Sequence, residues 1–227
     1  MHKDTYVIIP VYNEGPVIAS VIRDVFKKFS NVICVNDGSS DNSLSEIRRA
    51  GAIAVNHPIN LGQGASIQTG IEYSLQDPGA RHFITFDADG QHRTQDAEAM
   101  LKHLKKQSLD IVLGSRFLGS AQNIPQLKKI LLKAAIRFSN LSTGVHLTDA
   151  HNGLRAFNRH VAENLNITMP DMAHSSEIIH RIAECNFMYE EIPVTTLYTE
   201  YSKAKGQPLL NSVNIMFDEL LQKVSKK

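Results

Sequence analysis

The first half of the chain alternates between short apolar, β-branched runs and segments with the periodicity of helices. The apolar runs cover residues 6–9, 32–35, 52–55, 83–86 and 111–113, and the helical segments cover residues 16–29, 42–50, 63–76 and 95–107. Strands separated by helices form right-handed βαβ units, which build a largely parallel sheet covered by helices on both faces. The sequence therefore predicts an α/β fold with a Rossmann-like sheet.

The second half of the chain is less regular. Residues 123–141, 174–184 and 209–224 carry apolar side chains at helical spacing, and we expect short strands just after residue 154 and at 192–194. No internal repeat or low-complexity linker divides the chain, so we predict a single domain over residues 1–227 that ends in an amphipathic helix.

Composition excludes several classes of protein. The formal net charge is +1 and no nucleic-acid-binding motif occurs, so we expect no nucleic-acid partner. Cys34 lies in an apolar run, and we expect Cys34 and Cys185 to be buried thiols in a reducing cytoplasm. No stretch approaches the ~20 apolar residues that a membrane-spanning helix needs. We therefore expect a cytoplasmic protein that lies, at most, on the inner face of a membrane.

Polar residues follow three of the predicted strands, at residues 10–14, 36–41 and 87–92. In open α/β sheets, ligands bind beyond the carboxyl ends of the strands. Because the three polar segments share that edge, we expect them to form one binding site.

Asp87, Asp89 and Gln91 are spaced two residues apart at the end of an apolar run. Alternate side chains of an extended segment point to the same side, so these three can converge. Carboxylate and amide oxygens suit Mg²⁺ or Mn²⁺, with positions left open for phosphate oxygens. The alternative interpretation is an acidic turn, since Asp and Gly are common turn residues.

Two further segments allow a structural or a functional interpretation. Residues 36–38 read Asn-Asp-Gly, which is either a turn or a place where Asp37 accepts hydrogen bonds from a base or ribose. Residues 60–65 form a glycine-bearing turn that opens a helix, and its amides can face an anion. The turn does not follow a G-x-G-x-x-G or P-loop pattern.

Six motifs occur in a characteristic order over about residues 5–160. They are Ile9-Pro10-Val11-Tyr12-Asn13-Glu14, Val35-Asn36-Asp37-Gly38-Ser39-Ser40-Asp41, Asn60-Leu61-Gly62-Gln63-Gly64, Asp87-Ala88-Asp89-Gly90-Gln91-His92, Gly114-Ser115-Arg116 and Asp149-x-x-x-Gly153-x-Arg155. On these motifs the chain resembles family 2 glycosyltransferases with the GT-A fold. More narrowly, it resembles the dolichyl- or polyprenyl-phosphate sugar synthases.

The resemblance implies a mixed, mostly parallel GT-A sheet and a role for each motif. A nucleotide-sugar half would extend to about residue 115, followed by an acceptor half from about residue 116 to 227. The residues implied in binding the nucleotide-sugar are Pro10, Tyr12, Glu14, Asp37, Gly62, Gly64, Asp87, Ala88 and Asp89. Asp87, Asp89 and Gln91 would hold Mg²⁺ or Mn²⁺. The catalytic candidates are Asp149, Arg116 and Lys203, and Arg155 and Ser202 would lie on the acceptor side.

The implied reaction is an inverting transfer from a UDP- or GDP-linked sugar. A divalent cation and a nearby Arg116 would stabilise the charge that develops on the leaving diphosphate. A polyprenyl phosphate acceptor is already anionic, so Asp149 would only orient it or a cation. With a sugar hydroxyl as acceptor, Asp149 becomes the best candidate for a general base, because an alcohol must lose its proton.

One stretch departs from the family pattern. Where the synthases have Arg-x-x-Gly-x-Ser-Lys, residues 197–203 retain Ser202 and Lys203 but not the Arg and Gly. An alternative function is therefore transfer to a hydroxyl of a glycan or lipid-linked saccharide in surface polysaccharide synthesis. Another is a non-catalytic nucleotide-sugar-binding subunit of a membrane complex. The amphipathic helices with basic flanks either contact a membrane or membrane-protein partner, or cover the protein's own core.

Overall fold

The structure is a computed structural model of the 227-residue chain, and it describes residues 1–121, 136–137, 140, 143–149, 152–169, 173–197 and 201. Its strands and helices follow one another in a βα alternation and then in a less regular second half. In chain order they are β1 (His2–Val11), α1 (Ile18–Phe26), β2 (Phe29–Asp37), α2 (Ser43–Ala50), β3 (Ile53–His57), α3 (Gln63–Leu75), β4 (His82–Thr85), α4 (Thr94–Gln107), β5 (Ile111–Ala121), β6 (Arg155–Asn158), α6 (Arg159–Asn164), α7 (Ala173–Glu184) and β7 (Tyr189–Thr196).

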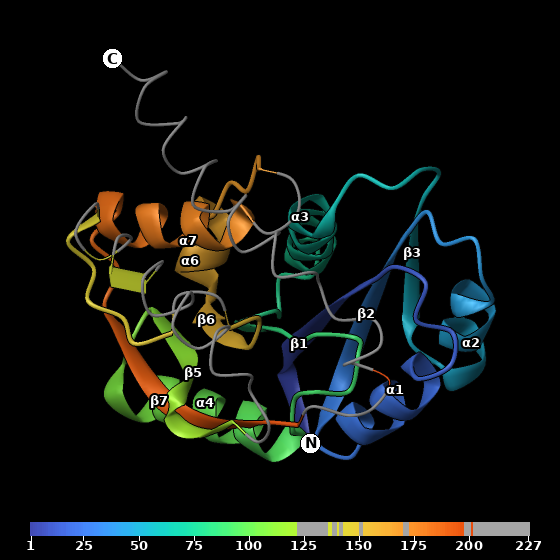
Figure 1. The fold of residues 1–227 in the computed structure, drawn as a ribbon, viewed down its shortest axis with the longest axis horizontal. Coiled ribbons are helices and arrows are strands. Elements are labelled where there is room, and N and C mark those ends of the chain that lie inside the picture. Colours follow the sequence, from blue (N-terminus) through green and yellow to red (C-terminus); the bar gives the residue numbers. More distant parts are fainter. Residues whose placement is uncertain are drawn as a thin grey trace.

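The strands form one seven-stranded sheet in the order β3-β2-β1-β4-β6-β5-β7 (Figure 1). Strand β1 pairs in parallel with β2 and with β4, and β2 pairs in parallel with β3. Strands β5 and β7 are also parallel to each other. Strand β6 runs antiparallel to both of its neighbours, β4 and β5. The carboxyl ends of the six other strands therefore share one edge of the sheet. The first residue of β6, Arg155, comes to the same edge, where it pairs with Thr85 and Leu113. The predicted mixed, mostly parallel sheet is confirmed.

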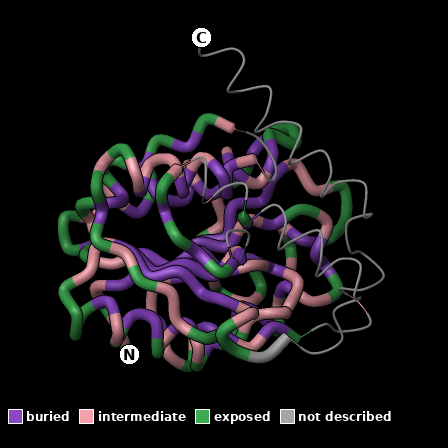
Figure 2. The backbone as a smooth tube through the Cα atoms, turned by 60° about the vertical axis from the view of Figure 1, so that its left-hand side comes forward, coloured by how far each residue is buried: buried purple, intermediate pink, exposed green. Residues whose placement is uncertain are grey.

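Helices cover both faces of the sheet (Figure 1). Helices α1, α2 and α4 contribute to one core cluster, and α3, α6 and α7 contribute to the other. The adjacent residues Ile8 and Ile9 of β1 are both fully buried and belong to opposite clusters, as the two-residue period of a strand requires. The central strands form a continuous buried layer (Figure 2). A strand buried on both faces has to be apolar throughout, which explains the uninterrupted apolar runs in the sequence.

The predicted elements of the first half are confirmed, but several strands extend beyond the predicted runs: β1 begins at His2, and β5 continues to Ala121. Helix α1 ends at Phe26, earlier than predicted, because β2 already begins at Phe29. In the second half, the predicted helix at 174–184 is α7, the strand at 192–194 is part of β7, and the short helix α6 was not predicted. The predicted helix at 209–224 lies outside the described residues, and so does most of the predicted helix at 123–141.

Cys34 is fully buried, as predicted, but the prediction for Cys185 is wrong. Cys185 is only half-buried, because it follows the last residue of α7 at a turn. Among the described residues, no helix is long and apolar enough to cross a membrane.

Candidate active site

Two loops are joined to each other at the edge where the parallel strands end. Asn13, at the end of β1, adopts a left-handed backbone with φ 53°, a conformation that Asn tolerates better than most residues. Its N–H donates to Ser39 Oγ at 2.9 Å, and its Oδ1 accepts from the N–H of Ser40 at 2.9 Å. The N–H of Glu14 donates to Ser43 Oγ at 2.8 Å. The loops after β1 and β2 therefore form one connected wall of the site.

Three predicted donor-binding residues lie in or next to this wall. Pro10 is half-buried, the Tyr12 side chain is 47% exposed, and Glu14 is buried. The Glu14 Oε2 atom accepts a hydrogen bond from the Tyr201 hydroxyl at 2.8 Å, so Tyr201 contacts this wall of the site. Their contacts with a nucleotide stay a prediction.

Asp37 is buried and its carboxylate is bound by the protein itself. It lies 2.7 Å from His57 Nδ1 and accepts hydrogen bonds from the N–H groups of Leu61 at 2.9 Å and Gly62 at 2.8 Å. His57 Nε2 lies 3.0 Å from the Thr69 hydroxyl on α3. The anion that the Gly62 amide faces in this structure is thus Asp37, which fixes the turn that opens α3. Direct binding of a base or ribose by Asp37 stays a prediction.

Backbone geometry accounts for both glycines of this turn. Gly62 has φ +94°, which favours glycine. A Cβ atom on Gly64 would collide with the carbonyl oxygen of Met169 and press against His174, so the close approach of α3 to this segment requires glycine. Their predicted role in nucleotide binding remains untested.

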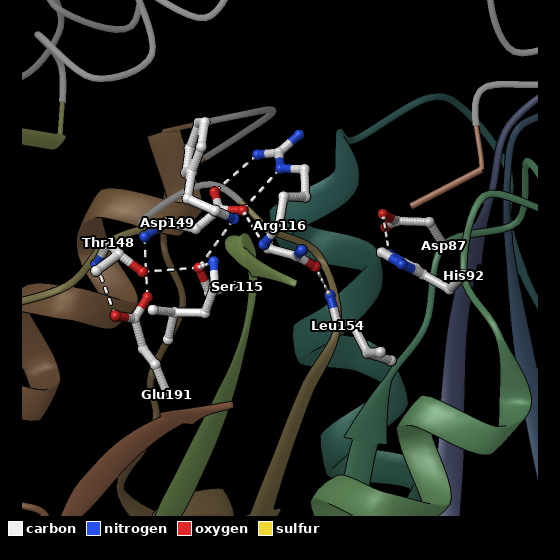
Figure 3. A network of polar contacts seen from close by, with 11 residues as sticks. Asp87, His92, Ser115, Arg116, Thr148, Asp149, Leu154 and Glu191 are labelled. Atoms are coloured by element: carbon white, nitrogen blue, oxygen red, sulfur yellow. Dashed lines mark hydrogen bonds and ion pairs between the residues drawn. The ribbon is translucent and has the colours of Figure 1, made fainter. Parts of the chain in front are cut away.

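The two carboxylates after β4 lie in contrasting surroundings. Asp87 Oδ2 is 2.7 Å from His92 Nε2 (Figure 3). Asp87 Oδ1 accepts a hydrogen bond from Gln63 Nε2 at 3.2 Å. Asp89 Oδ1 accepts from the N–H of Gln91 at 3.0 Å. Ala88, between the two carboxylates, is buried in the core. A Cβ atom on Gly153 would collide with the Asp87 carboxylate, so glycine is needed there.

The pKa values of the two carboxylates shift in opposite directions. Burial, and next the negative charge of Asp87, raise the pKa of Asp89 to about 6. Burial acts to raise the pKa of Asp87 as well, but the charge and hydrogen bond of His92, together with the charges of Arg155 and His174, lower this pKa overall. Asp89 therefore ionises against the field of an ionised neighbour. Two carboxylates that repel each other are the arrangement that a divalent cation relieves.

The donor set fits a magnesium-like ion that binds together with a phosphate ligand. Among the described residues no group of three or more His, Cys, Asp or Glu side chains gathers at metal-binding spacing. Mg²⁺ is usually bound by one or two carboxylates, with substrate phosphates and water completing its shell. Gln91 makes its contacts through the main chain, donating to Asp89 and accepting from Leu197 N at 2.9 Å. Its place as a ligand stays a prediction.

Arg116 and Asp149 form a paired unit on the other side of the site (Figure 3). Asp149 Oδ2 accepts from Arg116 Nε at 2.7 Å and from its main-chain N at 2.9 Å, and Oδ1 accepts from Nη2 at 2.8 Å. Asp149 is 1% exposed. Arg116 lies where the pairing of β5 with β7 shifts register, between Ser115 and Ser120. The structure thus brings together two of the predicted catalytic residues, in contact with each other.

Arg155 is a buried cation between the two acidic centres. Its Nη2 donates to Ser175 Oγ at 2.9 Å, and within the described part of the chain its Nε and Nη1 have no hydrogen-bond partner. Burial lowers its pKa to about 10, while the charges of Asp87 and Asp149 act in the opposite direction. Its positive charge compensates the negative charges of these two carboxylates. That Arg155 lies on the acceptor side stays a prediction.

Sequence reasoning missed several residues that hold this site together. They are His57, Gln63, His92, Glu191 and Tyr201. Three had an available signal: His57 ends β3 at the same edge, Gln63 lies in the motif at residues 60–64, and His92 ends the motif that begins at Asp87. The predicted residues Ser202 and Lys203 lie outside the described residues.

Comparison with known proteins gives matches over most of the chain. The model of glycosyl transferase family 2 matches residues 6–165. A UDP-N-acetylglucosamine–dolichyl-phosphate N-acetylglucosaminyltransferase from Methanococcus voltae is 30% identical over 248 residues, covering 99% of this chain and 98% of that protein. A polyprenol monophosphomannose synthase from Mycolicibacterium smegmatis is 28% identical over 214 residues, covering 88% and 80%.

A solved structure has the same fold. It is glucosyl-3-phosphoglycerate synthase from Mycobacterium tuberculosis in complex with Mg²⁺ and uridine diphosphate, with a TM-score of 0.71 and 13% sequence identity. The match covers 94% of this chain and 78% of that one. At this identity the likeness concerns the fold.

Proposed function

Because the chain belongs to glycosyl transferase family 2 and has the GT-A fold, we propose that it transfers a sugar from a UDP- or GDP-linked donor to polyprenyl phosphate. The transfer inverts the anomeric centre, requires Mg²⁺ or Mn²⁺, and takes place at the cytoplasmic face of a membrane. Two similar proteins are named for sugar transfer to dolichyl phosphate and for synthesis of polyprenol monophosphomannose, which supports this acceptor class.

The observation that carries the proposal is the pair of carboxylates after β4, at the edge where the parallel strands end. Asp87 and Asp89 would hold the divalent cation, with Gln91 as a further ligand. The ion, when bound, supplies positive charge for the diphosphate that leaves. His92 and Gln63 contact the Asp87 carboxylate and fix its orientation.

The donor would lie across the wall formed by the loops after β1 and β2. Pro10, Tyr12 and Glu14 would contact the nucleotide, and Ala88 would support the sugar diphosphate from below. Asp37 would serve the same pocket by fixing the turn at residues 60–62, through its bonds to Leu61 and Gly62. The Tyr12 side chain is 47% exposed, and its ring would contact the base.

The acceptor side would be built around Arg116 and Asp149. An oxygen of the polyprenyl phosphate forms the new bond to the anomeric carbon, while the bond from that carbon to the donor diphosphate breaks and the nucleoside diphosphate leaves. An anionic phosphate oxygen needs no general base. Both oxygens of Asp149 accept hydrogen bonds from Arg116, which suits a carboxylate that orients a guanidinium better than one that takes up a proton. Ser202 and Lys203 would complete the acceptor side.

A competition between acceptors tests the proposal. The protein is incubated with UDP- and GDP-sugars and Mn²⁺, with polyprenyl phosphate, polyprenol and an oligosaccharide offered together. We expect a glycosylated phospholipid and one equivalent of nucleoside diphosphate, and no product from the other two acceptors. Transfer to the hydroxyl acceptors alone would contradict the proposed acceptor. Nucleotide binding without any transfer would favour a binding subunit.

The variant Asp149→Asn separates the two acceptor classes further. With a phosphate acceptor we expect a modest loss of rate, because Asn keeps one acceptor oxygen for Arg116 and no proton is removed. With a hydroxyl acceptor, loss of a general base costs about 10²- to 10⁴-fold. Flotation of the protein with anionic liposomes tests the proposed location at a membrane. Protein that remains in the unbound fraction would contradict that location.

A further inference from the structure

The side chain of Glu191 on β7 binds two successive amides of the segment that presents Asp149. Its Oε2 accepts from the N–H of Thr148 at 2.6 Å, and its Oε1 accepts from the N–H of Asp149 at 2.9 Å (Figure 3). Each carboxylate oxygen thus fixes one peptide unit. The two residues are joined to β7 although they are more than forty positions away in the sequence.

The same segment is also fixed from β5. The hydroxyls of Thr148 and Ser115 lie 2.7 Å apart, and the Asp149 carboxylate binds Arg116. Strands β5 and β7 are neighbours, with Leu113 paired to Glu191. Residues 148–149 are therefore held by two adjacent strands. Their main-chain N–H groups bind the Glu191 side chain of β7, and their side chains bind Ser115 and Arg116 of β5.

The chemistry at position 191 requires a carboxylate. Two N–H groups of successive residues need two acceptor oxygens, and glutamate provides both, whereas glutamine would turn an NH₂ group toward one of the donors. Burial raises the pKa of Glu191, and the hydrogen bonds from the two amides offset this cost in solvation only in part. Glu191 contacts the main chain of Asp149 rather than its carboxylate.

We propose that Glu191 is a positioning residue for the transfer reaction: it fixes the main chain at residues 148–149 so that Asp149 orients Arg116 on the acceptor side. The inference rests on the proposed function, because it assigns the Arg116–Asp149 pair to the acceptor. Glu191 touches neither the donor nor the reacting atoms. It acts through Asp149, and its effect is confined to the acceptor side of the site.

Glu191→Gln tests the proposal, with Glu190→Gln as the matched control. Glu190 lies on the same strand, and its half-exposed side chain contacts His103 at 2.6 Å, away from the site. We expect Glu191→Gln to lower kcat/KM for the acceptor by about threefold to tenfold, the effect of one lost hydrogen bond, and by no more than Asp149→Asn does, because Glu191 acts through Asp149. The Kd for Mn²⁺ and nucleoside diphosphate should stay at the wild-type value, and Glu190→Gln should change neither quantity.

A double variant distinguishes positioning from general destabilisation. Glu191→Gln added to Asp149→Asn should cost little more than Asp149→Asn alone, since residues that act as one unit are not additive. Additive losses, or equal losses of donor binding and acceptor turnover, would overturn the proposal.

Hydrogen exchange tests the same contact without any substrate. The amides of Thr148 and Asp149 should exchange about tenfold faster in Glu191→Gln than in the wild type or in Glu190→Gln. Unchanged exchange at these two amides would overturn the positioning role whatever the acceptor is. Failure of the wild-type protein to use polyprenyl phosphate would instead contradict the proposed function.

Discussion

Replacing Asp89 by Asn should stabilise the metal-free protein near neutral pH. The Asn side chain has almost the same shape, and its carbonyl oxygen can still accept the hydrogen bond from the Gln91 N–H. The substitution removes the negative charge of a partly buried carboxylate that lies next to Asp87. Residues that bind a ligand's charge often cost stability in the ligand's absence, so the gain is expected on physical grounds.

The size of the effect follows from the pKa of Asp89, which rises from 3.8 to about 6. One pKa unit corresponds to about 1.4 kcal/mol, so the shift sets an upper limit of about 3 kcal/mol. Because Asp89 is partly exposed, we expect about 1 to 2 kcal/mol, or a rise in Tm of about 2 to 8 °C for a chain of this size.

The sign of the pH dependence follows from the same shift. A carboxyl group with a raised folded-state pKa favours the folded state most when it is protonated, and this contribution is lost as the pH rises through about 6. The advantage of Asp89→Asn should therefore be complete above that pH and vanish below about pH 4.

Thermal unfolding in EDTA, followed by circular dichroism, measures this difference. Asp24→Asn is the control, because Asp24 is exposed on α1 and its replacement should change the free energy of unfolding by no more than about 0.5 kcal/mol. An Asp89→Asn protein that is no more stable than the wild type near neutral pH would refute the reasoning. The same gain at low pH would refute it too.

Three further substitutions test separate parts of the structure. Gly153→Ala places a methyl group against the Asp87 carboxylate, so the Kd for Mn²⁺ measured by titration should rise. An unchanged Kd would show that the close approach of Gly153 to Asp87 is unimportant for metal binding. Phe83→Ala removes a fully buried ring and should lower the free energy of unfolding in urea by about 3 to 5 kcal/mol, whereas a loss below about 1 kcal/mol would contradict the packing. Two lysines lower the pKa of Glu98 to about 2, so Glu98→Gln should cost up to about 1 kcal/mol at neutral pH. This difference should disappear as the pH falls through about 2, and a loss that persists there would not be electrostatic.

The edge of the sheet where the site lies was predictable from the sequence. Apolar runs in alternation with helices define a parallel sheet, and the polar residues that follow such runs have to meet at one edge. Asp87 and Glu14 lie there after β4 and β1, and Asp37 is the last residue of β2. The antiparallel insertion of β6 was harder to predict, because a strand of four residues carries no sign of its direction.

The partners of the charged residues were not predictable. Asp37 binds His57 twenty positions away, and Asp149 binds Arg116 and the side chain of Glu191 over longer separations. These contacts depend on which strands become neighbours and on the shift of register after Ser115, which is a property of the assembled sheet. Motifs place residues at the site, but tertiary pairing decides which of them remain available to a ligand.

Binding of nucleoside diphosphates with and without Mn²⁺ tests the central claim, that Asp87 and Asp89 hold a metal ion and the donor diphosphate. Calorimetric titration of the wild type with UDP and GDP should show that Mn²⁺ tightens binding of one of them by about tenfold or more, since the ion adds charge at the diphosphate. In Asp89→Asn, Mn²⁺ should no longer tighten binding. Equal affinity with and without Mn²⁺ in both proteins would contradict the account.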